Sequence, residues 1–128
     1  MATWPGVTGD VVTSAMWNGL PAFTVQTAKT ADYTAASGDE YQQLVPMNKA
    51  TAIAFKLPTD ATYNFAVGTV ITVLNIGVGT CTISAVTPGT TTLLSAGATA
   101  ASPTLAQYKS AACIKTAANA WYVVGAVA

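Results

Sequence analysis

The sequence predicts an all-β protein, and three observations support this. Short runs rich in β-branched and aromatic residues recur along the chain, Gly, Pro and Asn corners separate them, and no helical pattern exceeds about two turns. We expect about eight to ten short strands in an antiparallel β-sandwich or small barrel, because strands joined by short turns usually pair as hairpins. A chain of 128 residues can bury a real core as a single domain.

The strand pattern is clearest in residues 65–84. Residues 69–75 are rich in β-branched side chains, and residues 80–84 alternate between polar and apolar types. Between the two runs, Gly77 and Gly79 can adopt a positive φ without steric cost. We therefore expect a β-hairpin here, at the centre of the domain.

The remaining elements follow in order. Strands are expected at residues 22–27, 40–45, 51–57, 92–95, 104–108, 111–116 and 121–125, with turns or loops at 28–39, 58–65, 88–89, 96–103 and 118–119. Alternation in residues 51–57 places Ile53, Phe55 and Leu57 inside and Lys56 outside.

Residues 1–21 differ from the domain expected at residues 22–128. Pro5, Gly6 and Pro21 interrupt regular structure, and capping residues around 13–19 allow one short helical turn. This segment either folds back on its own core or docks on a neighbouring subunit, and we favour a docking arm. The expected partner-binding residues are Trp4, Val7, Val11, Val12, Met16, Trp17 and Leu20.

Charge is scarce, at 8% of residues, and the net charge is zero. Five scattered Lys cannot neutralise a row of phosphates, so we expect no nucleic-acid partner. No apolar run reaches the roughly 18 residues of a membrane span, and the first residues lack a secretory pattern, so we expect synthesis in the cytoplasm and no membrane partner. A neutral surface of small residues favours work inside an assembly.

Catalysis is not expected. The chain has no His, the commonest general base and metal ligand. Four carboxylates, at Asp32, Asp39, Glu40 and Asp60, lie in separate turns or loops and suggest solvated positions rather than a catalytic pair. We expect no enzyme activity, cofactor or metal.

Three weaker features concern binding or covalent bonding. Asp10, Asp32 or Asp60 could join a calcium site, but their spacing does not form a loop cage. A glycan platform could use Tyr33, Tyr41, Tyr63 and Tyr108, although such tyrosines are more often half-buried packing residues. Cys81 and Cys113 are expected to be small core residues rather than a disulfide.

Several motifs resemble the small β-domains of tailed-bacteriophage virion proteins, in tail fibres and head decoration proteins. They comprise a run from Phe65 to Ile83 with glycines at 68, 77 and 79, then Tyr108, Ser110, Ala111 and Lys115, and finally Trp121 and Gly125. Residues 9–18 are similar to the attachment segment that begins many such chains.

This resemblance implies a β-sandwich that forms a homotrimer without catalytic residues. Fibre subunits usually carry a long shaft, and here only a short arm precedes the domain, so the expectation is a head decoration (cement) protein. Its partners would be itself and the major capsid protein, and its location the virion, assembled in the host cytoplasm. The alternatives are a tail-fibre or tail-tip module that binds a host surface glycan, and an unrelated carbohydrate-binding module.

Overall fold

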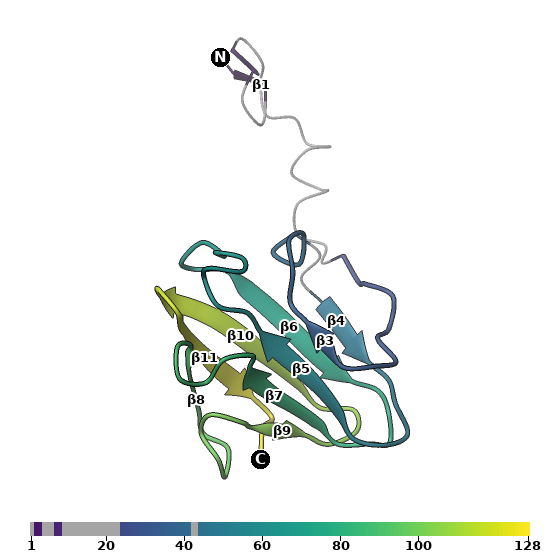
Figure 1. The fold of residues 1–128 in the computed structure, drawn as a ribbon. Helices are drawn as coiled ribbons and strands as arrows, with labels where there is room; N and C mark the ends of the chain where they lie inside the picture. Colours follow the sequence, from purple (N-terminus) through teal and green to yellow (C-terminus); the bar gives the residue numbers. More distant parts are fainter. Residues whose placement is uncertain (1, 4–6, 9–23, 42–43) are drawn as a thin grey trace.

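The computed structural model describes residues 2–3, 7–8, 24–41 and 44–128, and within these ranges the protein is all-β with no helix (Figure 1). The strands are β1 (Ala2–Thr3), β2 (Val7–Thr8), β3 (Tyr33–Thr34), β4 (Leu44–Met47), β5 (Ile53–Leu57), β6 (Val70–Asn75), β7 (Cys81–Ala85), β8 (Thr92–Ser95), β9 (Thr104–Leu105), β10 (Ser110–Ala117) and β11 (Ala120–Gly125). The helical turn expected in the N-terminal arm lies outside the described residues.

Nine of these strands form two mixed sheets. The five-stranded sheet has the order β4-β6-β10-β11-β8, and the four-stranded sheet has the order β3-β5-β7-β9. From β3 to β10 the chain alternates between the sheets, so β3, β5 and β7 run parallel in one while β4 and β6 run parallel in the other. The strands β1 and β2 form a separate antiparallel pair.

The expected antiparallel pairing of consecutive strands is therefore wrong. The runs at residues 69–75 and 80–84 are strands, but β6 pairs with β4 and β10, whereas β7 pairs with β5 and β9. The corner between them crosses from one sheet to the other and is not a hairpin. Within the two sheets, β10 and β11 are the consecutive described strands that do pair, around the expected turn at residues 118–119. Neither sheet closes into a barrel among the described strands.

Close backbone contact explains the two glycines of this corner. Neither Gly77 nor Gly79 has a positive φ. Instead, a Cβ at Gly77 would collide with the backbone of Lys49, and one at Gly79 would collide with the backbone of Thr51. The amide of Gly79 donates to the carbonyl of Lys49 at 2.9 Å. The β6–β7 corner thus stacks on the β4–β5 corner, and only residues without a side chain fit there.

Asn75 joins this corner to the next segment from inside the fold. Its fully buried Nδ2 donates to the carbonyls of Gly79 at 2.9 Å and Leu105 at 2.8 Å, and its Oδ1 accepts from the Gly77 amide at 3.1 Å. Because a buried amide group is costly without partners, these bonds make asparagine well suited to this position.

Three expected strands differ from the structure. One was expected at residues 104–108, where β9 covers only Thr104–Leu105. The turn expected at 28–39 also contains the short strand β3. In the described part of 22–27, the chain makes only single bridges, Val25 to Leu44 and, farther on, Lys29 to Met47. The strand expected at 40–45 is β4, which starts later and includes Pro46. Proline is tolerated because β4 is the edge strand of its sheet.

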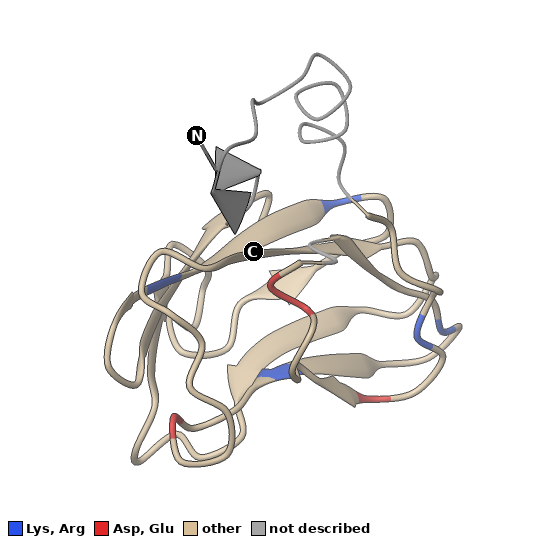
Figure 2. Ribbon diagram, turned by 90° about the horizontal axis from the view of Figure 1, so that it is seen from above, with Lys and Arg blue, Asp and Glu red and all other residues tan. Residues whose placement is uncertain are grey.

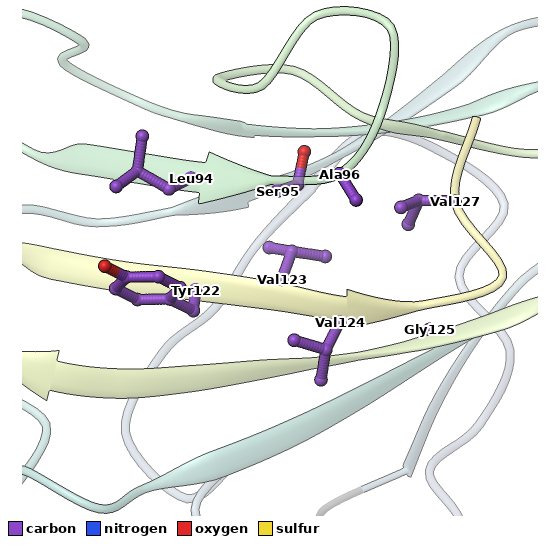
Figure 3. Close-up of a pocket in the computed structure, with 8 residues that line it drawn as sticks. All are labelled: Leu94, Ser95, Ala96, Tyr122, Val123, Val124, Gly125 and Val127. Carbon is purple, nitrogen blue, oxygen red and sulfur yellow. The ribbon is translucent and has the colours of Figure 1, made fainter.

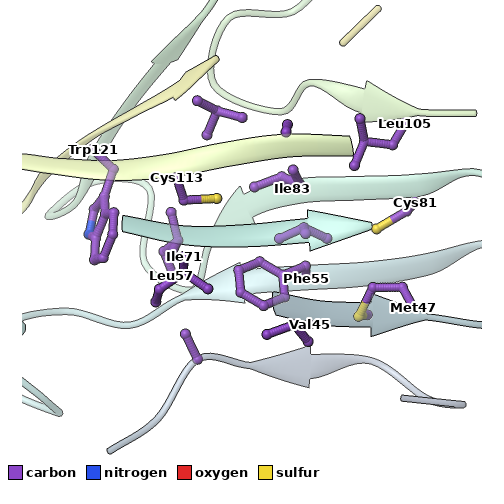
Figure 4. Packing of buried hydrophobic residues seen from close by; sticks show 14 of the residues in the cluster. Val45, Met47, Phe55, Leu57, Ile71, Cys81, Ile83, Leu105, Cys113 and Trp121 are labelled. Atoms are coloured by element: carbon purple, nitrogen blue, oxygen red, sulfur yellow. The ribbon is translucent and has the colours of Figure 1, made fainter. Parts of the chain in front are cut away.

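One hydrophobic core lies between the sheets (Figure 4). The predicted register of residues 51–57 is confirmed, since Ile53, Phe55 and Leu57 are buried and alternate with partly exposed Ala54 and Lys56. Trp121 and Phe65 meet edge to face in the same core, with ring centroids 5.7 Å apart. The core therefore draws on strands from both sheets and on the loop before β6.

We predict that Gly79→Ala destabilises the protein by about 3 kcal/mol or more, because the new methyl group must displace the Thr51 backbone. Gly89→Ala is the matched control, since a methyl group added there would meet nothing within 4 Å beyond its chain neighbours, and the φ of Gly89 is not positive. Chemical denaturation of both variants measures the difference. Equal stability would show that the two corners do not stack as described.

Candidate interaction surface

The outer face of the five-stranded sheet carries an apolar row that crosses four strands. Cross-strand pairing aligns Val70 with Ile114, Ile114 with Tyr122, and Tyr122 with Leu94. Leu94 is 43% exposed, Tyr122 46% and, beside the row, Val124 49%. A continuous exposed apolar surface of this kind is typical of an interaction site.

This face contains no charged side chain among its described strands. The outward positions of β6, β10, β11 and β8 are occupied by Val70, Thr72, Leu74, Ser110, Ala112, Ile114, Thr116, Ala120, Tyr122, Val124, Thr92 and Leu94. The outward positions of the four-stranded sheet are small or polar: Thr34, Ala54, Lys56, Thr82, Ser84 and Thr104. Figure 2 shows the described charges dispersed around the molecule rather than gathered on one face. The two faces therefore differ in character, and the apolar one is the candidate surface.

A cavity of about 250 Å³ opens at one edge of this face, between β8, β11 and the C-terminal segment (Figure 3). Its walls include Leu94, Tyr122, Val124 and Val127. Ser95 also lines it, but its hydroxyl donates to the Ala100 carbonyl at 2.8 Å and accepts from the Gly97 amide at 3.2 Å. Since an apolar cavity of about 150 Å³ can hold benzene, this one suits an apolar side chain.

A lysine that sequence reasoning missed is buried on the opposite side of the same sheet. Lys115 is 1% exposed, and its Nζ donates to Asp60 Oδ1 at 2.5 Å, Asn64 Oδ1 at 2.8 Å and the Phe65 carbonyl at 2.8 Å. The hydrogen bond from Lys115 lowers the pKa of Asp60 below its usual value. Period-two alternation was the available signal, because Lys115 shares the inward register of Ala111 and Cys113.

The other described carboxylates have structural partners. Buried Asp39 accepts bonds from the Tyr33 hydroxyl at 2.8 Å and Gln26 Nε2 at 2.7 Å. Asp32 Oδ1 accepts the Ala54 amide at 2.9 Å. In the described residues, no group of three His, Cys, Asp or Glu side chains is placed to hold a metal ion; Asp10 lies outside them.

The four tyrosines of the possible glycan platform have different environments. Tyr33 packs against Phe55, and burial together with Asp39 raises its pKa. Tyr63 packs against Phe65, and its hydrogen bond to Glu40 raises its pKa. Tyr41 and Tyr108, by contrast, are 80% and 75% exposed. Two of the four therefore serve packing, as the sequence suggested.

Most of the expected partner-binding arm lies outside the described residues. Trp4, Val11, Val12, Met16, Trp17 and Leu20 lie outside the described residues, and Val7 is described only as part of β2. The division into an arm at 1–21 and a domain at 22–128 stays a prediction. Sequence reasoning overlooked the outer face, although four consecutive apolar residues, Trp121 to Val124, indicate a strand that is apolar on both sides.

The two cysteines lead to a testable prediction about thiol reactivity. Cys81 and Cys113 are buried and unpaired, as predicted. Burial raises the pKa of Cys81 to about 11 and raises that of Cys113 as well, so both thiols are protonated at neutral pH. Since the thiolate is the nucleophile, we predict no reaction of the native protein with a thiol reagent at pH 8 and two reactive thiols per chain in denaturant. Rapid labelling of the native protein would contradict this.

Comparisons with protein-family models, with curated proteins and with solved structures give no match. The described residues also contain no helix with the length and hydropathy needed to cross a bilayer. The residues that carry the resemblance to phage proteins are therefore interpreted from their positions in the fold. The function is inferred from the surface of this chain.

Proposed function

We propose that this chain is a non-enzymatic structural protein of a bacteriophage particle. In this proposal it is a capsid decoration (cement) protein that binds the head shell as a homotrimer, and its two sheets form a β-sandwich. The arm, with one short helical turn, attaches it to coat subunits. The location is the virion, after assembly in the host cytoplasm.

The observation that carries the proposal is the uncharged apolar face of the five-stranded sheet. Burial of apolar area contributes about 25 cal/mol per Å², and no described charge on this face opposes contact with an identical surface. Because the net charge of the chain is zero, long-range repulsion between copies is also weak. These properties favour self-association over a monomeric state.

The residues that carry the resemblance to phage proteins have structural roles. They therefore support the fold more than they support a particular function. Gly68 and Gly125 have φ values of 95° and 141°, in the region that favours glycine. Trp121 is 1% exposed in the core. The proposed decoration role therefore depends on the surface chemistry.

The alternative is a tail-fibre or tail-tip module that binds a host surface glycan. Highly exposed Tyr41 and Tyr108 favour it, because aromatic rings stack on sugars. A glycan array distinguishes the two: decoration predicts no specific ligand, whereas a receptor-binding module predicts saturable binding that is lost on substitution of Tyr41 or Tyr108.

We predict that the purified protein is a trimer in light scattering and that Tyr122→Lys weakens the trimer at least about tenfold, or about 1.4 kcal/mol. The substitution places a charge at the centre of the apolar row, where it would have to be desolvated. Thr82→Lys is the control, since Thr82 lies on the outer face of the other sheet. A monomeric wild type would remove the trimer, and equal dissociation of both variants would place the contact elsewhere.

We predict that removal of residues 1–20 leaves the β-domain folded and abolishes its binding to undecorated shells. Each buried Trp of the arm would contribute about 2 kcal/mol or more to attachment, so Trp17→Ala alone should weaken binding. Co-sedimentation with shells measures attachment, and thermal unfolding measures folding.

Unfolding of the truncated chain would instead assign the arm to the core of its own domain. A lower melting temperature for Trp17→Ala in the isolated protein would lead to the same conclusion. Attachment would then have to be sought on the outer face of the five-stranded sheet.

A further inference from the structure

Lys115 brings three kinds of reactive group together where the core meets solvent. Its own side chain is buried, whereas the Asp60 side chain is 18% exposed and Asn64 is exposed. Lys115 Nζ lies 2.8 Å from the carboxamide oxygen of Asn64 and 2.5 Å from a carboxylate oxygen of Asp60. The amine of Lys115 can act as a nucleophile and the carboxamide of Asn64 as an acyl donor. The carboxylate of Asp60 can accept and return a proton. No role in the proposed assembly function uses this cluster.

We propose that Lys115 and Asn64 become joined by an intramolecular isopeptide bond that the folded chain forms by itself. The side-chain nitrogen of Lys115 replaces the amide nitrogen of Asn64, and one ammonia molecule is released. Asp60 acts as the proton carrier. This proposal is independent of the assembly function.

The fold holds the nucleophile and the acyl group in contact. Lys115 lies on β10 between β6 and β11, and Asn64 immediately precedes Phe65, which is 1% exposed in the core. The carbonyl carbon of Asn64 is one C=O bond, about 1.23 Å, beyond the oxygen that Lys115 already contacts. Once the amine has rotated to bring its nitrogen within about 3.5 Å of this carbon, such placement can raise the effective concentration to about 10⁵ M or more, which makes an otherwise very slow aminolysis accessible.

The protons balance within the three side chains. Asp60 first accepts a proton from the Lys115 ammonium, and the neutral amine rotates and attacks the carbonyl carbon of Asn64. Asp60 gives this proton to the departing amide nitrogen and then accepts one from the former lysine nitrogen. The proton that remains on Asp60 passes to the released ammonia, which enters solvent as ammonium, and Asp60 returns to its carboxylate form. The C–N bond of the Asn64 amide breaks, ammonia leaves, and no oxidant or other reactant is consumed.

One electrostatic effect sets the pace of this reaction. The hydrogen bond from Lys115 lowers the pKa of Asp60, so the transfer of a proton to this carboxylate is uphill. We therefore expect slow formation of the bond, once per chain, after folding.

Asp60 is positioned both to move protons and to let ammonia escape. Its amide donates to Asn119 Oδ1 at 2.9 Å, and the Asn119 amide donates to Asp60 Oδ2 at 3.0 Å. These bonds leave Oδ1 directed at Lys115. The side chain of Asp60 is 18% exposed, so the cluster has an outlet to solvent on that side.

Mass spectrometry of the purified full-length chain tests the proposal directly. We expect an intact mass lower than that of the sequence by one ammonia. Trypsin cleaves after Lys56 and Lys109 and cannot cleave after an acylated Lys115, so digestion should yield one branched peptide that joins residues 57–109 to residues 110–128.

Three variants assign the roles. Asn64→Ala should have the full mass of its sequence, because it lacks the acyl group. Asp60→Ala, which removes the proton carrier and adds no carboxamide, should lose most of the cross-link while Lys115 and Asn64 remain. Asn48→Ala, which changes an exposed asparagine elsewhere, should retain the branched peptide.

An intact wild-type mass equal to that of the sequence overturns the proposal, whether or not any variant folds. Loss of one water in place of ammonia also overturns it, because Asp60 would then be the acyl donor. Loss of ammonia without a branched peptide has the same effect, since ring closure at Asn18-Gly19 would explain that mass.

Discussion

Backbone contact between two stacked corners is the constraint on which the fold depends. The chain alternates between the sheets, so the corner at residues 76–80 must lie on the corner at residues 48–52 rather than turn back beside its own strand. Gly77 and Gly79 permit that approach, and Asn75 satisfies the polar groups it buries. The same stacking produces the parallel pairs β4–β6 and β5–β7. The chain passes from β6 to β7 in the same direction as it passes from β4 to β5, so each strand lies parallel to its counterpart.

Several of the described charges are held by interactions within the fold. Lys115 and Asp60 pair beneath the five-stranded sheet, Asp39 is buried against Tyr33, and the Lys29 ammonium lies 4.3 Å from the centre of the Tyr33 ring. Such interactions fix loops to the core, and none of the described charges lies at an outward position of the five-stranded sheet. The outer face of the five-stranded sheet consequently has no electrostatic protection against contact with another apolar surface.

The strands were predictable and their partners were not. Alternation is a local property, so the sequence locates β5, β8 and β11 to within two residues, and it places Phe55 inside. A glycine corner is equally compatible with a hairpin and with a crossing between sheets. Which of the two forms here depends on contact with the backbones of Lys49 and Thr51, which lie much earlier in the sequence. The apolar face and Lys115 could have been found from alternation alone, whereas the partners of Lys115 required the fold, because Asp60 and Asn64 are more than 50 residues away.

The sheet edges are less suited than the apolar face to the proposed association. Beyond β4, the segment with Val25 and Lys29 bridges to the strand, and beyond β9 the C-terminal Ala128 exchanges backbone hydrogen bonds with Thr104 in both directions. The edge strands β3 and β8 have only two and four residues. Long open edges invite strand addition without limit, while a flat apolar face on a closed symmetry axis limits the number of copies. Bridged or short edges beside an apolar face without described charges therefore favour the proposed assembly of defined size over a fibre.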